Sequence, residues 1–196
     1  MSAFLFSCES EETKTPEENT KHQVEEVKKE VTIDLKNLRE FDMTKFDLEA
    51  TVYVPEKHYM ISEEEEGLED PVVKHNEGEA YWELSMRSDK TWNITIEDWG
   101  DEEKTIALEK EIHKETSSVY AYNYVEEGED FLMFQRSLNS GSTTTIDEKT
   151  ASKLPNYHFI VIKKINGIYI TIKSNDLGDY RKISVKKMLN AARAIK

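Results

Sequence analysis

Cysteine is almost missing from this chain: Cys8 is the only one among 196 residues. A single cysteine excludes a disulfide within the chain and any zinc site built on paired cysteines. Long hydrophobic runs are missing as well, since no stretch approaches the roughly 18 apolar residues that cross a bilayer as a helix. The seven glycines leave little material for phosphate-binding loops, and no glycine-rich nucleotide-binding motif occurs.

Catalytic and metal-binding motifs are also missing. The chain has no HExxH motif, no GxSxG nucleophile elbow and no histidine pair at i, i+4 spacing. His158 opens a predicted strand, where histidine usually has a structural role. Two acidic groups, residues 63–70 and 97–101, lack the alternating order of a calcium loop. We therefore predict no catalytic residue, no metal site and no cofactor.

Positive charge is scarce, because the chain carries a formal net charge of −14. This excess of negative charge argues against nucleic acid as a partner, since a polyanion would be repelled. The basic residues gather at one end: residues 149–196 contain 11 Lys and Arg against 2 Asp and Glu. The basic end could neutralise the acidic remainder within one domain, which we favour, or face a different partner.

The residues around the cysteine form a pattern. Leu5, Phe6 and Ser7 precede Cys8, in an order that resembles the lipobox of bacterial lipoprotein signals, whose cysteine thiol receives the lipid. We interpret residues 1–8 as the remnant of such a signal, ending at a lipidated Cys8. Residues 9–30 contain too few apolar side chains to offset chain entropy, which predicts a disordered acidic tether. The alternative is a frayed terminus with an unmodified cysteine.

Residues 31–196 are predicted to form a single domain. Alternating or apolar runs predict strands at residues 48–54, 59–62, 80–86, 92–97, 119–125, 131–136, 157–165 and 168–173. Asn166-Gly167, between the last two runs, is the strongest short signal for a hairpin with a type I′ turn. Residues 63–70 and 138–155 are predicted as loops.

Two segments have the hydrophobic period of a helix. The first is predicted from an N-cap at Asp101 to about Lys114, with Glu102 and Glu103 in its first turn. Its apolar face consists of Ile106, Ala107, Leu108 and Ile112. The second covers residues 182–196, and its apolar face consists of Val185, Met188, Leu189, Ala192 and Ile195. Short hairpins with these two helices predict an α+β fold, an antiparallel sheet with an internal and a C-terminal helix packed on it.

Several segments are similar to a known group. They are "IDLKNL" (33–38), "FDLEATVYVPE" (46–56), "NYVEEGEDFLMFQ" (123–135), "YHFIVIKKINGIYI" (157–170) and "VKKMLNAARAIK" (185–196). Together they resemble a group of uncharacterised Bacteroidetes lipoproteins over roughly residues 30–196, and the layout is similar to the PsbP-like α/β/α sandwich. The resemblance implies a lipid-anchored location in the cell envelope, at the outer membrane. It implies no functional residue, but Glu9, Glu11 and Glu12 resemble the signal that sends such lipoproteins to the cell surface.

Aromatic residues form the candidate ligand platform. Tyr120, Tyr122 and Tyr124 share one side of a predicted strand because side chains alternate along a strand. Trp82 and Trp92 lie in the preceding strand pair. Such a surface could stack a sugar, a peptide or a flat ligand, or it could pack under a helix with its hydroxyls at the rim, which is the commoner arrangement.

Three functions are compatible with these features. We favour a monomeric, non-enzymatic lipoprotein that is held at the membrane through Cys8 and binds an unidentified protein or small ligand. The second is a small hydrolase or metal-dependent enzyme whose residues meet only in the folded chain. A deep pocket lined by two or more of His58, His75 and His113, with neighbouring carboxylates, would favour that enzyme. The third is a cytosolic acidic interaction protein.

Overall fold

The computed structural model describes residues 32–60, 66–75, 78–139 and 155–196, and all of them belong to one compact unit, Thr32–Lys196. The predicted tether, Cys8 and most of the loop predicted over residues 138–155 lie outside the described residues.

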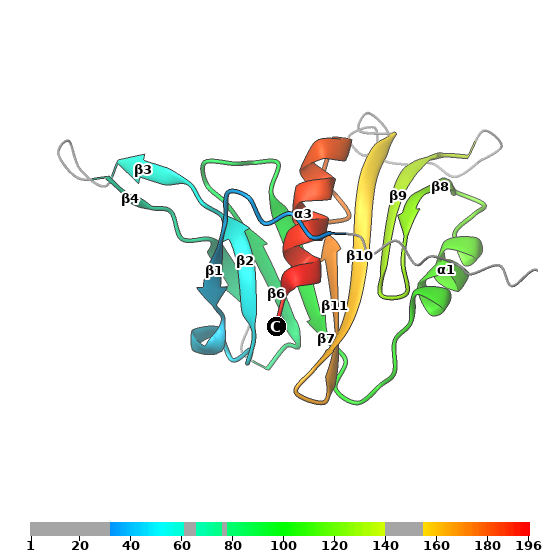
Figure 1. Ribbon diagram of the computed structural model, residues 1–196. Coiled ribbons are helices and arrows are strands. Elements are labelled where there is room, and N and C mark those ends of the chain that lie inside the picture. The colour runs from blue at the N-terminus through cyan, green and yellow to red at the C-terminus, as the bar shows by residue number, and fades with distance from the viewer. Residues whose placement is uncertain (1–31, 61–65, 76–77, 140–154) are drawn as a thin grey trace, which may run out of the picture. The chain divides into compact units, whose positions relative to one another are not determined.

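A seven-stranded antiparallel sheet forms the centre of this unit, in the order β5-β6-β7-β11-β10-β9-β8. Its strands are β5 (Val72–His75), β6 (Tyr81–Ser85), β7 (Asn93–Asp98), β8 (Tyr120–Glu127), β9 (Phe131–Leu138), β10 (Asn156–Ile165) and β11 (Ile168–Ser174). The hairpin β10–β11 is inserted between β7 and β9. Strands that are distant in the sequence, β7 and β11, therefore lie side by side in the middle of the sheet (Figure 1).

The predicted turn between β10 and β11 is confirmed. Asn166 has φ 51 and Gly167 has φ 92, and Ile165 pairs with Ile168. A two-residue type I′ turn requires positive φ at both central positions, which asparagine and glycine tolerate best. The turn fixes the register of β10 and β11 and so decides which of their side chains reach each face of the sheet.

Two smaller antiparallel pairs accompany the main sheet. β1 (Leu38–Asp42) pairs with β2 (Thr51–Pro55), and the connection contains a 3-10 turn at Thr44–Phe46. β3 (His58–Met60) pairs with β4 (Glu66–Leu68). The prediction of a loop throughout residues 63–70 is therefore wrong in part, because main-chain pairing with β3 makes a short strand without an apolar run.

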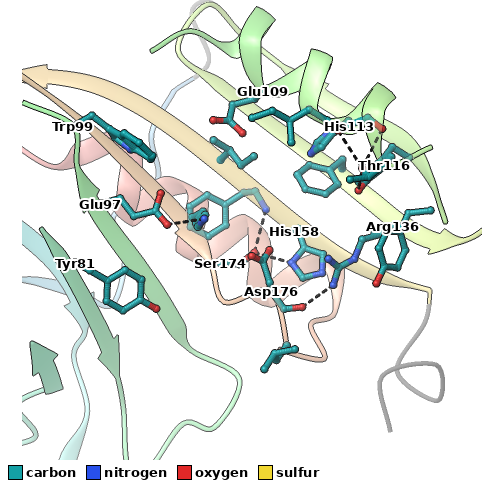
Figure 2. Close-up of a pocket in the computed structure, with 18 of the residues that line it drawn as sticks. Tyr81, Glu97, Trp99, Glu109, His113, Thr116, Arg136, His158, Ser174 and Asp176 are labelled. Carbon is teal, nitrogen blue, oxygen red and sulfur yellow. Dashed lines mark hydrogen bonds and ion pairs between the residues drawn. The ribbon is translucent and has the colours of Figure 1, made fainter. Parts of the chain in front are cut away.

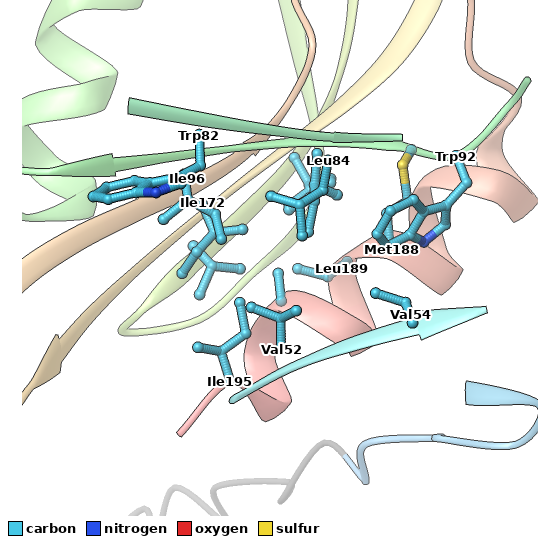
Figure 3. Packing of buried hydrophobic residues seen from close by; sticks show 14 of the residues in the cluster. Val52, Val54, Trp82, Leu84, Trp92, Ile96, Ile172, Met188, Leu189 and Ile195 are labelled. Atoms are coloured by element: carbon cyan, nitrogen blue, oxygen red, sulfur yellow. The ribbon is translucent and has the colours of Figure 1, made fainter. Parts of the chain in front are cut away.

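The C-terminal helix α3 (Lys182–Ala194) packs on one face of the sheet. The apolar face predicted for residues 182–196 is confirmed, since each of its five residues is at most 2% exposed. Figure 3 shows Met188 and Leu189 between β2, which carries Val52 and Val54, and the side chains of the sheet, with Ile195 beside Val52. This core joins the β1–β2 hairpin to the sheet through α3.

Main-chain and side-chain hydrogen bonds fasten the end of α3. The N–H of Thr51 donates to the carbonyl of Lys196 over 2.7 Å, and the N–H of Lys196 donates back over 3.2 Å. The Nζ of Lys163 on β10 donates to the carbonyls of Arg193 and Ile195, each over 2.7 Å. These bonds satisfy carbonyl groups that a helix leaves without partners at its C-terminal end.

The internal helix α1 (Ile106–Glu115) lies on the opposite face. On β10, Phe159 belongs to the α3-side core, whereas Ile160 and Ile162 form a second cluster with Ile106 of α1. Successive side chains of a strand point to opposite faces. One helix therefore packs on each face of the sheet, and the predicted α+β class is confirmed.

The predicted start and apolar face of α1 are wrong. Its N-cap is Thr105, whose Oγ1 accepts the N–H of Leu108 over 3.3 Å, and Asp101 lies before the helix. Of the predicted apolar face only Ile106 is buried, while Leu108 and Ile112 are each 49% exposed. The other buried residue of α1 is His113. Among the described residues, no helix has the length and apolar character that crossing a membrane requires.

Candidate functional site

A pocket of about 810 Å³ opens on the α1 side of the sheet. The ten residues of α1 make a helix about 15 Å long, whereas seven strands spaced about 4.8 Å apart make a sheet about 29 Å wide. α1 therefore covers only part of this face. Figure 2 shows the pocket, which is lined by side chains of α1, of the sheet and of the loop after β11.

An ion pair from the two central strands lies in the floor of the pocket. Ile96 and Ile172 point into the α3-side core, so their neighbours Glu97 on β7 and Lys173 on β11 point to the α1 side. Their charged groups are 2.7 Å apart, and both side chains are largely buried. Burial lowers the pKa of Lys173, but the hydrogen bond and charge of Glu97, with further carboxylates nearby, raise it overall. Lys173 therefore keeps its positive charge at neutral pH.

Two more carboxylates belong to the pocket. Glu109 extends from α1 and is partly buried, and burial raises the pKa of its carboxyl group, with the charge of Lys173 acting in the opposite direction. Asp176 follows β11 in the loop, and its main-chain carbonyl accepts a 2.6 Å hydrogen bond from Nη2 of Arg136. The guanidinium of Arg136 also lies 5.0 Å from the ring centre of Tyr120.

His113 connects α1 to the aromatic wall of β8 and β9. Its ring stacks on Tyr122 at a centroid distance of 4.1 Å and meets the edge of Phe134 at 4.6 Å. Burial, with the nearby positive charge of Arg136, lowers the pKa of His113 to about 4. The imidazole is therefore neutral at pH 7, and it serves as a flat, uncharged part of the wall.

His158 lies in the pocket wall at the centre of a hydrogen-bonded chain. Nδ2 of Asn156 donates to the carbonyl of Gly178, so its Oδ1 accepts from Nε2 of His158 over 2.9 Å. Nδ1 of His158 then accepts the hydroxyl proton of Ser174 over 2.9 Å, and Ser174 Oγ accepts from the N–H of Phe159. Burial, with the charge of Arg136, lowers the pKa of His158 to about 3. This series of hydrogen bonds holds the loop after β11 against β10.

The aromatic residues of the predicted platform fall in different places. Tyr120 and Tyr122 line the pocket. Tyr124 is 39% exposed, and its hydroxyl lies 3.4 Å from Nδ1 of His113. Trp82 and Trp92, by contrast, are 3% and 2% exposed in the α3-side core. The two tryptophans cannot belong to a ligand platform with the tyrosines, because they fill the other side of the sheet.

The histidine arrangement that would favour an enzyme is not found among the residues that line this pocket. Of His58, His75 and His113, only His113 lines the pocket, together with His158, which the sequence indicated as structural. The sequence interpretation also missed Glu109, Lys173 and other charged residues of the pocket. Alternation along β7 and β11 marked polar positions there, but nothing local indicated that these two strands are neighbours.

No group of three or more His, Cys, Asp or Glu side chains within the described ranges is placed to hold a metal ion. Neither a scan against protein-family models nor a search of curated proteins finds a match for this chain.

Proposed function

We propose that this protein is a binding protein for a small organic ligand and that the pocket beside α1 is its site. The observation that carries the proposal is the incomplete cover of the sheet: α1 leaves a pocket whose walls are aromatic and whose floor is charged. Tyr81 and Trp99, 37% and 39% exposed, stand at one end of the pocket, and His113 and Arg136 stand at the other (Figure 2). Tyr122 stacks on His113, and Tyr120 lies against Arg136. A mainly apolar pocket with a few convergent polar groups is typical of small-molecule sites.

Binding is favoured over hydrolysis because of the chemistry of the one serine–histidine contact in the pocket. Ser174 and His158 are 1% and 2% exposed. The hydrogen bonds that link them to each other, to Asn156 and to the N–H of Phe159 already use the polar groups of both side chains. An imidazole whose pKa is about 3 is also a weak base for activating a hydroxyl group at neutral pH. The contact is therefore better suited to holding the loop than to nucleophilic catalysis.

Screening by ligand-observed NMR tests this proposal on the full chain. We expect soluble small molecules with a ring or a short hydrocarbon part to bind and to perturb the fluorescence of the protein through Trp99. Tyr81→Ala and Trp99→Ala should each weaken such binding about 2- to 10-fold, the range for losing one aromatic contact. Tyr53→Ala, a tyrosine outside the pocket, is the matched control. Ligands that respond equally to all three substitutions, or a screen without any binder, would refute the proposal.

We further propose that the binding domain is a monomer displayed in the cell envelope by a lipid on Cys8, at the outer membrane. Support comes from the Leu5-Phe6-Ser7-Cys8 pattern, the polar segment after it and the resemblance to Bacteroidetes lipoproteins with a PsbP-like layout. The acidic residues after the cysteine favour the outer surface. A negative net charge of −14 favours partners other than nucleic acid.

Metabolic labelling tests the anchor. The full gene product, expressed in a bacterium with its natural upstream sequence, should incorporate a radioactive fatty acid and stay with membranes in 1 M salt. High salt screens attraction by basic residues, because the Debye length falls to about 3 Å, but it leaves the burial of acyl chains intact. Cys8→Ser should abolish the label. Wild-type protein without label would refute the anchor and leave the cytosolic alternative.

A further inference from the structure

The pocket contains more negative than positive charge. Four acidic residues line it, Glu97, Asp98, Glu109 and Asp176, against the two basic residues Lys173 and Arg136. Because both imidazoles titrate far below pH 7, they add no positive charge at neutral pH. A ligand that enters this pocket therefore meets a negative electrostatic potential.

Both cations of the pocket already have partners. Nζ of Lys173 is paired with Glu97, and Arg136 donates to the Asp176 carbonyl and lies against the Tyr120 ring. The Nε of Arg136 has no hydrogen-bond partner, but it is buried and closed to a ligand. These engaged cations make the pocket a poor site for an anion.

Unlike the two cations, two of the carboxylates have no hydrogen-bonding partner among the described residues. Asp98 accepts the N–H of Gly100 over 2.7 Å, but no described residue donates a hydrogen bond to the carboxylate of Glu109 or Asp176. In Figure 2, Glu109 lies in the upper part of the view and Asp176 in its lower part, beside Ser174. The two interact electrostatically, because the charge of Asp176 contributes to the raised pKa of Glu109. Glu109 is partly buried, whereas Asp176 is exposed to solvent. A partly buried carboxylate without a donor, such as that of Glu109, is stabilised when a cation supplies hydrogen bonds.

The other lining residues indicate which kind of cation the pocket favours. Ten of the twenty lining residues are aromatic or aliphatic, and Trp99 and Ile112 are exposed at the mouth. Trp99 already holds a cation, since Nζ of Lys104 lies 3.7 Å from its ring centre. Aromatic faces beside carboxylates are favourable to alkylammonium groups, whose carbon part is easily desolvated.

We propose that the ligand of the pocket is an organic cation, a primary ammonium group on a hydrocarbon body. The carboxylates of Glu109 and Asp176 receive the ammonium group, and Tyr81, Trp99 and Ile112 contact the body. This inference rests on the proposed function, since it assigns a ligand class to the same site.

Matched six-carbon probes test it on the full chain by isothermal titration calorimetry. Hexylamine should bind about tenfold more tightly than hexan-1-ol, which has the same body without the charge, and hexanoate should bind more weakly still. Glu109→Gln and Asp176→Asn should each reduce the affinity for hexylamine by about three- to tenfold and leave hexanol binding unchanged. Glu111→Gln, on the same helix but 64% exposed and outside the pocket, should change neither affinity. Circular dichroism of each variant checks that the fold is retained.

The possible results separate the two proposals. Equal binding of hexylamine and hexanol, or tightest binding of hexanoate, would overturn the cation assignment and leave a binding pocket of another specificity. A screen that finds binders while hexylamine fails would overturn it too. If neither the probes nor any compound of the screen binds, the proposed function itself fails.

Discussion

Acidification should destabilise this protein through His113. Its pKa is about 4 in the fold, against 6.5 for an ordinary histidine, so the unfolded chain takes up a proton between these values and the folded chain does not. Proton uptake by the unfolded chain lowers the free energy of unfolding. This loss of stability is absent above pH 6.5 and grows as the pH falls toward 4. Each pH unit in this window costs about 1.4 kcal/mol, so moving from pH 7 to pH 5 should cost about 2 kcal/mol at this residue alone.

The variant His113→Phe isolates this contribution. Phenylalanine keeps an aromatic ring against Tyr122 and Phe134 but cannot titrate. Urea denaturation at pH 7 and pH 5 should show that the variant loses about 2 kcal/mol less stability than the wild type. Contributions of opposite sign, such as that of Glu109, cancel in this comparison. His58→Gln, whose histidine side chain is 54% exposed, should behave like the wild type, and an equal loss in His113→Phe would show that His113 is protonated within the fold.

Three further substitutions test the framework around the pocket, each by chemical denaturation. Gly167→Val should cost on the order of 1–2 kcal/mol from backbone strain at φ 92, because an added Cβ meets no atom within 4 Å outside the neighbouring residues. A neutral result would contradict the turn type. Ile172→Ala, at a position 0% exposed in the α3-side core, should cost about 2–5 kcal/mol, and a loss under 1 kcal/mol would mean that the core is loosely packed. Lys163→Met should cost about 1–3 kcal/mol by leaving two carbonyls at the end of α3 without their donor, while the exposed neighbour substitution Lys164→Met should have little effect.

Local signals in the sequence predicted the elements whose structure depends on neighbouring residues. Asn166-Gly167 predicted a turn because few other pairs tolerate positive φ at both positions, and the apolar spacing of residues 185–195 predicted the buried face of α3. For Trp82 and Trp92 the signal was present and misread. Trp82 shares its side of a strand with Leu84, and Trp92 shares its side with Ile94, so alternation placed both tryptophans on an apolar face.

The pocket could not be predicted in the same way. Glu97 and Lys173 meet because β11 pairs with β7, and this pairing depends on the whole sheet rather than on residues near either one. His113 was assigned to no face because the predicted apolar stripe of α1 passed through Leu108 and Ile112, which are half-exposed. The length of α1 relative to the width of the sheet, which leaves the pocket open, emerges only when the two are assembled.

The position of α3 between the β1–β2 hairpin and the main sheet also determines the order of folding. β1 and β2 form a sheet of their own, and Val52 and Val54 are buried largely by α3, which lies more than a hundred residues later in the chain. A contact of such long sequence separation forms slowly, because a large loop must close first. During synthesis the apolar face of the hairpin therefore stays uncovered until α3 has been made. In the native state the two should also open as one cooperative unit, so their amide hydrogens should exchange at a common rate.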